Sequence, residues 1–318
     1  MPMICRSAFA LIVGFAAFGC GPETTEVPGP DDRRPVPSLS PGTNGSVIQV
    51  TTGVYFACAL KSDGTLACWG DNFGDATSPP QGTFSQVAAG YFHACAVRTD
   101  GTVACWGFGE SGETTPPSGT FTKVSGGSGF TCGIRTDATI ACWGYDADGR
   151  TTPPEGTFVD LSLFSAHGCA VRTDGSLACW GLDDHGETIP PAGSFTRVST
   201  GEVHTCAIDD NSRLQCWGYN EDRRATPPGG RFKHVGVGMY HTCAVRTSGT
   251  LACWGPNTFF GGPDASGEIR PPGGKFTQVS SQQYYSCGLR SDGFVECWGS
   301  DDHGQASPPG GVRPPGGS

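Results

Sequence analysis

A short pattern of apolar and polar residues recurs along this chain at a spacing of 37 residues. One clean copy begins at Phe84 and reads FSQVAAGYFHACAVRTDGTVACWGFGESGETTPPSGT. Within the copy, apolar or small side chains alternate with polar ones over short stretches, and Gly, Asp and Pro separate these stretches. Alternation of this kind between turn residues predicts short β-strands. A copy of this length has room for three or four strands and none for a helix.

The tripeptide Cys-Trp-Gly marks every copy. Its Trp residues are the seven Trp of the chain: Trp69, Trp106, Trp143, Trp180, Trp217, Trp254 and Trp298. The first six lie 37 residues apart and the last gap is 44, so seven copies fill residues 47 to about 312. Seven β units of this size predict an all-β fold, a seven-bladed β-propeller, in which radial repetition protects the sheet edges. A linear β-solenoid is the alternative, but it needs distinct terminal repeats, and the first and last copies are ordinary.

The hairpin inside each copy can be placed in register from its turn. In the first copy, the three-residue turn Ser-Asp-Gly at 62–64 puts Leu60 opposite Leu66. Cys58 then stands opposite Cys68. Asp followed by Gly is typical of a type I turn whose last residue is left-handed. Directly opposite residues place their Cβ atoms about 4.5–5.5 Å apart, which is close to disulfide reach.

The same ten-residue spacing separates a pair of Cys in every copy. Zinc binding is the competing interpretation, but no CxxC or HxxxH accompanies the pairs. We therefore predict one cross-strand disulfide per blade, formed in an oxidising compartment: Cys58/Cys68, Cys95/Cys105, Cys132/Cys142, Cys169/Cys179, Cys206/Cys216, Cys243/Cys253 and Cys287/Cys297. Each contributes ~1–3 kcal/mol when the stabilisation is treated as loop entropy. Even the low end sums to the stability of a whole domain.

The N-terminus has the features of a targeting segment. Arg6 precedes an apolar run of about 12 residues, too short for a hydrocarbon core of ~30 Å, so residues 1–19 are predicted to be a signal peptide. The run ends in AFGC at 17–20, which resembles the lipobox of bacterial lipoproteins. That resemblance implies cleavage before Cys20, a lipid on its thiol, and the outer membrane, because Gly rather than Asp follows. The first two residues of the motif depart from the usual pattern, which leaves plain secretion open.

Residues 20–46 are predicted to be the lipidated Cys and a disordered linker, since Pro, Gly, Ser, Thr and charges dominate there. Such a segment buries too little apolar surface to offset its ordering entropy. The propeller then occupies 47–318. Cys20 has no partner among the seven pairs, and acylation would remove a free thiol from an oxidising space.

The repeat Gly-x-x-His-x-Cys-Ala-x-x-x-Asp-Gly-x-x-x-Cys-Trp-Gly resembles that of the regulator of chromosome condensation family. That family forms seven-bladed propellers, and the short period also resembles the bacterial propeller that inhibits β-lactamases. The resemblance covers 47–312 and implies the same fold. The founding member is a nuclear guanine nucleotide exchange factor, but a signal peptide, seven disulfides and an acidic chain contradict a nuclear role. Exchange activity is therefore not expected.

Composition narrows the class of partner. Gly accounts for 50 of 318 residues, which argues against long helices. The formal net charge is −10, whereas nucleic-acid binding draws on clustered Lys and Arg, so no nucleic-acid partner is expected. No further stretch is apolar enough to span a bilayer, so a membrane is contacted only through the lipid. No cofactor or metal is predicted, and the chain is expected to be a monomer.

Two repeated positions hold candidate functional side chains. The residue two before the leading Cys is aromatic or His in every copy: Phe56, His93, Phe130, His167, His204, His241 and Tyr285. A ring of His suggests metal binding, but the aromatic replacements favour a structural plug in which His makes a backbone hydrogen bond. The residue three after the same Cys is basic in all copies but the one with Asp209: Lys61, Arg98, Arg135, Arg172, Arg246 and Arg290. We predict a local ion pair with the turn Asp.

The loops after Cys-Trp-Gly hold 15 of the 30 carboxylates: Asp71, Asp75, Glu110, Glu113, Asp146, Asp148, Asp183, Asp184, Glu187, Glu221, Asp222, Asp264, Glu268, Asp301 and Asp302. Strand parity places these loops on the face of the Gly-x-x-His loops, opposite the basic positions. A ring of like charge would steer a basic partner, and carboxylates are also Ca²⁺ ligands, although no loop has the density of a calcium site. Solvated charge is the simplest interpretation. The repeated Asp-Asp-His triplets make Asp183, Asp184, Asp301 and Asp302 candidate contacts.

The sixth copy has an insert of seven residues, and its loop holds Phe259 and Phe260. Exposed aromatic pairs are typical interface anchors, and packing onto the rim is equally open. No Gly-x-Ser-x-Gly or His-Glu-x-x-His motif indicates catalysis. The sequence therefore predicts a non-catalytic, envelope-anchored scaffold that binds a protein partner through its acidic loop face. The alternatives are an inhibitor of a secreted or periplasmic enzyme, and a glycan-binding or glycan-active enzyme.

Overall fold

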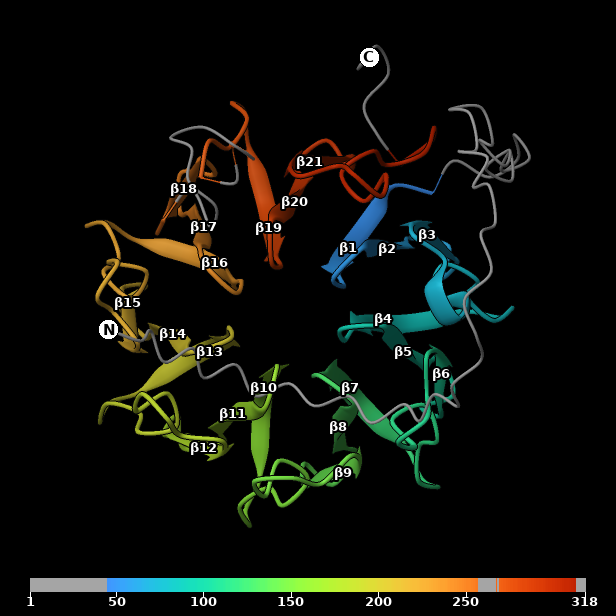
Figure 1. The fold of residues 1–318 in the computed structure, drawn as a ribbon, viewed down its shortest axis with the longest axis horizontal. Helices are drawn as coiled ribbons and strands as arrows, with labels where there is room; N and C mark the ends of the chain where they lie inside the picture. The colour runs from blue at the N-terminus through green and yellow to red at the C-terminus, as the bar shows by residue number, and fades with distance from the viewer. Residues whose placement is uncertain (1–44, 257–266, 268, 313–318) are drawn as a thin grey trace, which may run out of the picture. The chain divides into compact units, whose positions relative to one another are not determined.

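A computed structural model describes residues 45–256, 267 and 269–312. All of these residues lie in one compact unit, Gly42–Ser318. There, seven three-stranded antiparallel sheets surround a common centre (Figure 1). The predicted all-β, seven-bladed propeller is confirmed. Among these residues the only helical element is the 3-10 turn η1 (Phe73–Asp75), and no helix is long and apolar enough to cross a membrane.

Each blade has an inner, a middle and an outer strand that follow one another in the sequence, and blades are numbered in chain order. The inner strands are β1 (Val47–Thr52), β4 (Phe84–Ala89), β7 (Phe121–Gly126), β10 (Phe158–Phe164), β13 (Phe195–Thr200), β16 (Phe232–Val237) and β19 (Phe276–Ser281). The middle strands are β2 (Phe56–Lys61), β5 (His93–Arg98), β8 (Phe130–Arg135), β11 (His167–Arg172), β14 (His204–Asp209), β17 (Thr242–Arg246) and β20 (Tyr285–Arg290). The outer strands are β3 (Leu66–Gly70), β6 (Val103–Gly107), β9 (Ile140–Gly144), β12 (Leu177–Gly181), β15 (Leu214–Gly218), β18 (Leu251–Trp254) and β21 (Val295–Gly299).

The hairpin between middle and outer strands has the register that its turn predicts. Leu60 faces Leu66, and Cys58 faces Cys68, across β2 and β3. The turn glycine Gly64 has φ 81°, the left-handed conformation that favours glycine. A ten-residue spacing around a tight turn is therefore enough to place the two Cys of a blade opposite each other.

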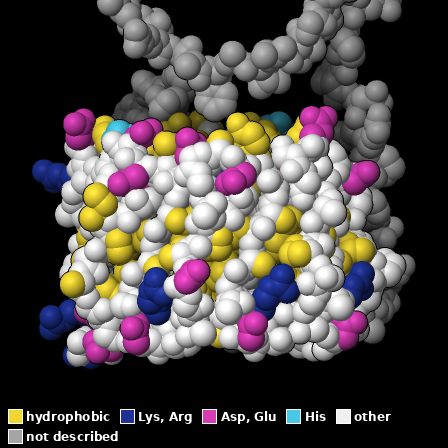
Figure 2. All heavy atoms as spheres, turned by 90° about the horizontal axis from the view of Figure 1, so that it is seen from below, with side chains coloured by type: hydrophobic (Ala, Val, Ile, Leu, Met, Phe, Trp, Pro, Cys, Tyr) yellow, Lys and Arg dark blue, Asp and Glu magenta, His cyan; other side chains and the backbone are white. Residues whose placement is uncertain are grey.

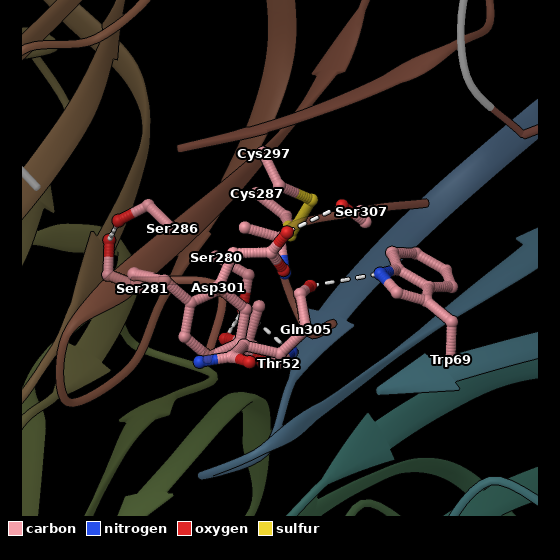
Figure 3. Close-up of a disulfide and its surroundings, with 12 residues drawn as sticks. Thr52, Trp69, Ser280, Ser281, Ser286, Cys287, Cys297, Asp301, Gln305 and Ser307 are labelled. Atoms are coloured by element: carbon pink, nitrogen blue, oxygen red, sulfur yellow. Dashed lines mark hydrogen bonds between the residues drawn. A yellow bond between two sulfur atoms is a disulfide. The ribbon is translucent and has the colours of Figure 1, made fainter. Parts of the chain in front are cut away.

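The predicted disulfide is present in every blade, as Figure 3 shows for the last one. The two Cys of each bridge have their Cα atoms 4.0–4.1 Å apart. The seven bridges are Cys58–Cys68, Cys95–Cys105, Cys132–Cys142, Cys169–Cys179, Cys206–Cys216, Cys243–Cys253 and Cys287–Cys297.

The two ends of a bridge differ in burial, which the sequence did not distinguish. The leading Cys of each pair, on the middle strand, is buried. Its partner on the outer strand is only partly buried, because that strand is the outer edge of the blade and packs on fewer neighbours. These partly buried residues are Cys68, Cys105, Cys142, Cys179, Cys216, Cys253 and Cys297. A reductant therefore approaches each bridge from the outer strand.

Two blades carry a residue other than glycine at the left-handed turn position. Ala138 has φ 69° and Ser212 has φ 65°. The left-handed conformation costs an L-residue roughly 1–2 kcal/mol, and the extra chain entropy of glycine offsets only part of that. We expect Ala138→Gly and Ser212→Gly each to raise the free energy of unfolding by about 0.5–1 kcal/mol, measured by denaturant titration with the disulfides intact. Gly101→Ala, the reverse change in blade 2, is the control and should lower it; a destabilised Ala138→Gly would contradict the argument.

The ring closes between blades 7 and 1. The Val47 N–H donates to the Gly293 carbonyl at 2.9 Å, and the hydroxyls of Thr52 and Ser280 lie 2.8 Å apart. Val50 and other apolar side chains of blade 1 share one buried cluster with blade 7. Direct contact between the first and last copies excludes the open solenoid. The remaining apolar clusters likewise join neighbouring blades, so most of the core lies between blades.

Candidate functional site

The two faces of the ring differ in what joins the strands. The turn face carries the tight turns between middle and outer strands. The loop face carries the loops between inner and middle strands and the longer loops after the outer strands. Backbone hydrogen bonds link these two kinds of loop: the Asp71 N–H donates to the Tyr55 carbonyl at 2.8 Å, and the Phe108 N–H to the Phe92 carbonyl at 3.0 Å. The prediction that they share a face is confirmed.

The repeated His or aromatic position is the first residue of the middle strand in six blades and directly precedes it in blade 6, and it is buried in all seven. Where this position is His, the imidazole Nε2 forms a hydrogen bond with a hydroxyl of the following blade. The four pairs are His93–Thr131 at 2.8 Å, His167–Thr205 at 3.0 Å, His204–Thr242 at 2.8 Å and His241–Ser286 at 2.8 Å. The prediction of a structural plug is confirmed. The expected backbone partner is wrong, because the imidazole bonds to a side chain of the next blade.

This contact follows a rule that can be read in the sequence. The residue just after the plug position is Thr or Ser in every blade that follows a His. Where the plug is Phe56, the following blade has Ala94 instead, and the two pack in one cluster. Tyr285 at the ring closure donates its hydroxyl to the Gly53 carbonyl at 2.8 Å. A Cβ on Gly90 would lie 2.4 Å from the His93 ring, which explains the glycine of the Gly-x-x-His motif.

The plug His residues are neutral at neutral pH. Burial lowers the pKa of His93 and of His167 to about 4, and that of His241 to about 3. Burial also holds the pKa of His204 well below its usual range. The Thr131 hydroxyl donates to the Glu113 carbonyl at 3.1 Å, so the His93 Nε2–H donates to Thr131. In the described part of the chain, no cluster of three or more His, Cys, Asp or Glu side chains is placed to hold a metal ion.

Several carboxylates of the acidic loops hold those loops closed. Glu113 and Glu187 are only 2% and 1% exposed. Glu113 accepts the Ser111 N–H at 2.9 Å, and Glu187 accepts the His185 N–H at 2.7 Å. Asp146 accepts a backbone N–H five residues further along at 3.1 Å. Solvation, the simplest interpretation of these loops, is therefore wrong for the buried pair, whose charge is not available to a partner.

The candidate contacts of the Asp-Asp-His triplets lie in blades 4 and 7. Asp183 and Asp301 each accept a backbone N–H within their own loop, at 3.0 and 2.7 Å. Asp302 accepts a hydroxyl of its loop at 3.0 Å. Asp184 is exposed and makes no hydrogen bond within the described residues. The fold does not bring the two triplets together into one site.

The basic position of the turn face stacks on aromatic rings. Four Arg place their guanidinium carbon 4.9–5.1 Å from the centre of the Phe ring that begins the inner strand of the same blade: Arg98, Arg135, Arg172 and Arg246. Each of these Arg also donates a hydrogen bond to a carbonyl of the loop before that strand. The predicted ion pair is wrong for these four. Arg290 alone among the Arg of this position pairs with a carboxylate in the described structure, with Asp292 at 3.2 Å and Glu296 at 2.7 Å. Most of the Lys and Arg visible on the side shown in Figure 2 lie in its lower half.

The loop face carries a group of aromatic side chains outside the repeated plug and Cys-Trp-Gly positions. Tyr55 lies 6.2 Å from Phe92 and 4.3 Å from His303 between ring centres. Phe73 lies 5.6 Å from Phe92 and 5.4 Å from Phe108. Phe73 is 52% exposed. We call these five residues, which come from blades 1, 2 and 7, the aromatic cluster.

Sequence reasoning missed the aromatic cluster. The signal was the residue just before the plug position, which is aromatic in four copies: Tyr55, Phe92, Tyr240 and Tyr284. A second aromatic follows Trp-Gly directly in three copies: Phe108, Tyr145 and Tyr219. Neither position is aromatic in every copy, and the second is Asp71 in the first copy, so the sequence has no regular aromatic pattern there.

Comparison with known proteins identifies the repeat. Four segments match the family described as regulator of chromosome condensation (RCC1) repeat: residues 47–74, 84–113, 195–223 and 232–260. The chain is an RCC1-like seven-bladed propeller. A search of curated protein sequences finds no match.

The RCC1-like propeller is similar in fold to several solved structures. The ectodomain of the receptor kinase ACR4 from Arabidopsis thaliana is 25% identical, with a TM-score of 0.66 over 80% of this chain and 96% of that one. The ectodomain of the receptor kinase CR4 from Physcomitrella patens is 22% identical, with a TM-score of 0.68 over 80% and 74%. Prp20p from Saccharomyces cerevisiae is 13% identical, with a TM-score of 0.63 over 82% and 83%.

At the centre of its loop face, the RCC1-like propeller carries a strut across the central channel. The Tyr91 hydroxyl of blade 2 donates to the Glu202 carboxylate of blade 5. The Ser165 hydroxyl donates to the other oxygen of Glu202 at 2.9 Å. Burial and the nearby Glu202 charge raise the pKa of Tyr91, so this phenol stays protonated. The strut closes part of the channel mouth on this face.

The insert of blade 6 lies mostly outside the described residues. Phe259 and Phe260, and the two carboxylates Asp264 and Glu268, fall there. The aromatic pair therefore stays a prediction. Within the described part of the RCC1-like propeller, the aromatic cluster is an exposed group that fits the role of interface anchor expected of that pair.

Proposed function

We propose that this chain is a non-catalytic scaffold that binds a protein partner through its loop face, with the aromatic cluster as the centre of the contact. The exposure of Phe73, at 52%, carries the proposal. A large ring so exposed leaves apolar surface in water, and aromatic side chains are enriched at the energetic centres of protein interfaces. Phe73 is held in place by the rings on either side of it, so little conformational entropy is lost when a partner covers it.

The charges around the aromatic cluster point to a partner with basic side chains. Asp71 lies 3.3 Å from His303 of the cluster, carboxylate oxygen to Nδ1. Asp75 is exposed in the same loop as Phe73. The complementary surface would combine an apolar side chain with Lys or Arg. Solved neighbours agree with a binding role: yeast RCC1 has been solved bound to Kap60, and the structure of Prp20p was studied together with its binding properties to Gsp1p and histones.

The proposal can be tested with a photo-crosslinking amino acid placed at Phe73 in the mature, oxidised chain. Ile48 is the matched control, since it is also 52% exposed but lies near the turn face, next to the residue that pairs with Lys61. We expect a protein of the source cell to be crosslinked from position 73 and not from position 48. Phe73→Ser should abolish crosslinking from a neighbouring probe at Phe108, while Ile48→Ser should not.

Each other outcome favours a different function. The crosslinked protein could be an enzyme of the envelope or the medium. If its activity fell on binding, the chain would be an inhibitor, which is a special case of a protein-binding scaffold. Crosslinking to glycan and to no protein would favour the glycan-binding alternative. Equal crosslinking from positions 73 and 48 would overturn the assignment to the loop face. Nucleotide exchange forms no part of the proposal.

We further propose that the chain is held at a bacterial outer membrane by a lipid on Cys20. Two observations support it: all fourteen Cys of the described blades are paired in disulfides, which needs an oxidising compartment, and Cys20 has no partner among them. Mass spectrometry of the N-terminal peptide should show a diacylglyceryl group on Cys20, and Cys20→Ala should release the protein from the membrane fraction. An N-terminal peptide without lipid would favour plain secretion.

A further inference from the structure

The seven inner strands line a central channel that encloses about 170 Å³. The third residue of each inner strand lines it, and the seven side chains form one polar ring: Gln49, Gln86, Lys123, Asp160, Arg197, His234 and Gln278. This ring was not among the features singled out in the sequence. We call it the channel ring.

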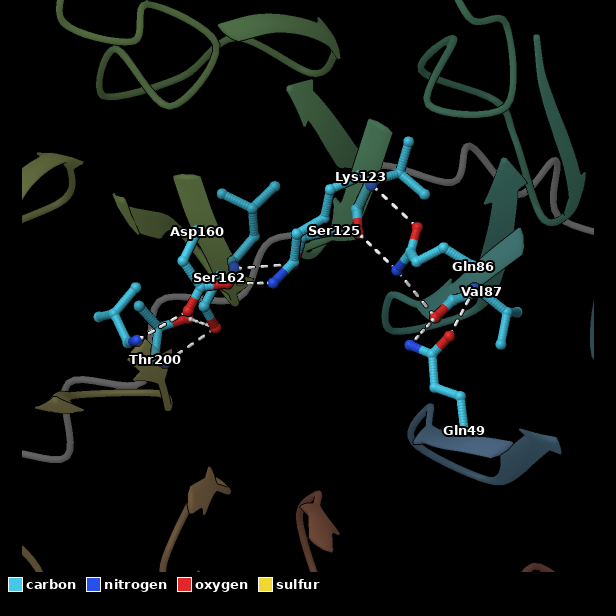
Figure 4. A network of polar contacts seen from close by, with 11 residues as sticks. Gln49, Gln86, Val87, Lys123, Ser125, Asp160, Ser162 and Thr200 are labelled. Atoms are coloured by element: carbon cyan, nitrogen blue, oxygen red, sulfur yellow. Dashed lines mark hydrogen bonds and ion pairs between the residues drawn. The ribbon is translucent and has the colours of Figure 1, made fainter. Parts of the chain in front are cut away.

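Three blades use an amide in the channel ring to bind the next blade. Gln49 accepts the Val87 N–H at 3.0 Å and donates to the Val87 carbonyl at 2.8 Å. Gln86 makes the same two bonds to Val124, at 2.9 and 3.1 Å (Figure 4). Gln278 accepts the Val50 N–H at 3.0 Å. The fourth residue of an inner strand therefore points its N–H at an acceptor supplied by the preceding blade.

Two further blades supply that acceptor without an amide. Asp160 accepts the Val198 N–H at 3.0 Å. His234 Nδ1 lies 3.5 Å from the Val279 N–H. Asp160 also pairs with Lys123, so the carboxylate and the ammonium compensate each other within the ring.

Two residues of the channel ring break this pattern. Lys123 has no acceptor to offer the Leu161 N–H of the next blade and pairs with Asp160 instead. Arg197 is the second. Its blade is followed by β16, where the N–H of Val235 occupies the position that faces the channel ring. A guanidinium has five donors and no acceptor, so Arg197 cannot bond to that N–H. Within the described residues, Arg197 makes no hydrogen bond and no ion pair, and it is exposed to solvent. Two donors, one of them charged, thus face the space between blades 5 and 6 with no acceptor between them.

The charges of the channel ring leave one cation uncompensated. Lys123 and Asp160 cancel each other. Burial, with help from the charge of Arg197, lowers the pKa of His234 to about 3, so its imidazole is neutral. Glu202 is the carboxylate at the loop-face mouth, where Tyr91 and Ser165 bind it. An anion therefore meets repulsion at that mouth and attraction at Arg197.

We propose that the central channel binds a small oxyanion, a phosphate, sulfate or carboxylate group, between the Arg197 guanidinium and the Val235 N–H. A bound oxygen supplies the acceptor that five of the other six blades obtain from Gln, Asp or His. Arginine suits this role because its planar fork presents paired donors to oxyanions. The channel volume admits an ion of a few heavy atoms and excludes a folded partner.

The test is a titration of the full, oxidised chain with inorganic phosphate at low ionic strength, followed by ³¹P NMR and calorimetry. Arg197→Gln is the informative variant, because it installs the amide of Gln49 and Gln86 and should fold without strain. We expect one phosphate per chain, and a loss of affinity of about tenfold or more in Arg197→Gln. Lys233→Gln removes a neighbouring exposed cation that does not line the channel, and it should bind phosphate nearly as well as the natural chain.

A parallel titration with acetate separates the two sources of oxyanion. Saturable acetate binding that competes with phosphate makes the ligand a carboxylate group in general; phosphate binding alone makes it a tetrahedral oxyanion. No saturation by either ion up to about 20 mM would overturn the site, since a dissociation constant above that limit corresponds to less than about 2.3 kcal/mol of binding free energy. Equal losses in Arg197→Gln and Lys233→Gln would also overturn it, because they would indicate diffuse attraction to the surface.

Discussion

Reduction of all seven disulfides is expected to unfold the propeller at neutral pH. Each bridge joins two residues ten positions apart and contributes ~1–3 kcal/mol. The sum, ~7–20 kcal/mol, equals or exceeds the free energy of unfolding of an ordinary domain. Only 36% of the chain is apolar, and the clusters between blades are small and rich in Ala and Val. Little hydrophobic stabilisation remains to hold the blades once the bridges are gone.

Tryptophan fluorescence should report this unfolding directly. Six indoles donate Nε1–H to a loop carbonyl of the preceding blade at 2.8–2.9 Å: Trp69, Trp106, Trp143, Trp180, Trp217 and Trp254. Loss of the blades would move these rings into water and shift their emission to longer wavelength. Thiols should be counted on the same sample. A propeller that kept its melting temperature with all fourteen thiols titratable would contradict the argument.

A single-bridge variant separates the local effect from the collective one. Cys169→Ala with Cys179→Ala removes the bridge of blade 4 and should lower the free energy of unfolding by ~1–3 kcal/mol while the fold is kept. A much larger loss would mean that one blade cannot form without its bridge. The result would then locate cooperativity inside the blade rather than between blades.

The blades could be predicted because their contacts are local in sequence. The turn at 62–64 fixes the register of β2 and β3, and that register places Cys58 opposite Cys68. No contact with another copy is needed to set this register, so the pattern of 37 residues contains all the information for one blade. The number of copies then gives the number of blades.

The contacts between blades could not be predicted in the same way. His93 and Thr131 lie 38 residues apart, and only the geometry of the ring shows that Nε2 meets that hydroxyl. Arg98 was expected to pair with the turn Asp, but Asp100 accepts the N–H and the hydroxyl of Thr102 at 2.9 and 2.7 Å. The guanidinium lies over Phe84 instead. Short-range hydrogen bonds of the turn thus outcompete the ion pair, which is worth little when exposed.

The aromatic cluster depends on ring closure and was invisible for that reason. His303 of blade 7 reaches Tyr55 of blade 1 only because the last copy lies against the first. The channel ring was missed for a related reason. Arg197 is an unremarkable surface residue in the sequence, and it stands out only when the acceptors of Gln49 and Gln86 show what its position normally supplies.

Acid is expected to destabilise the oxidised propeller between about pH 6.5 and pH 4. The unfolded chain binds protons at its His residues below about pH 6.5. In the folded chain, burial lowers the pKa of His93 and His167 to about 4 and of His241 and His234 to about 3. Between these values the unfolded state binds more protons, so the free energy of unfolding falls as the pH falls. The stabilisation is complete above about pH 6.5.

The size of this effect follows from linkage. At two pH units below the pKa of His in the unfolded chain, each such buried His has lowered the free energy of unfolding by about 2–3 kcal/mol. The four His residues together give about 10 kcal/mol, and His204, whose pKa burial also lowers, acts in the same direction. The turn Asp residues act at lower pH: their hydrogen bonds to Thr and Ser hydroxyls lower the pKa of Asp100, Asp137 and Asp174 below the usual value. Their contribution is lost only below about pH 4, so the window above it reports the His residues.

The chain itself provides the matched control, because one plug contact is built without ionisable groups. Phe56 stands where His93 stands, and Ala94 where Thr131 stands. The double variant His93→Phe with Thr131→Ala copies that contact and should change stability little at pH 7. Its unfolding free energy, measured by denaturant titration from pH 7 to pH 4.5, should fall less steeply, by the equivalent of one proton. An unchanged slope would mean that His93 is not neutral in the folded state, and the interblade assignment of its Nε2–H to Thr131 would be lost with it.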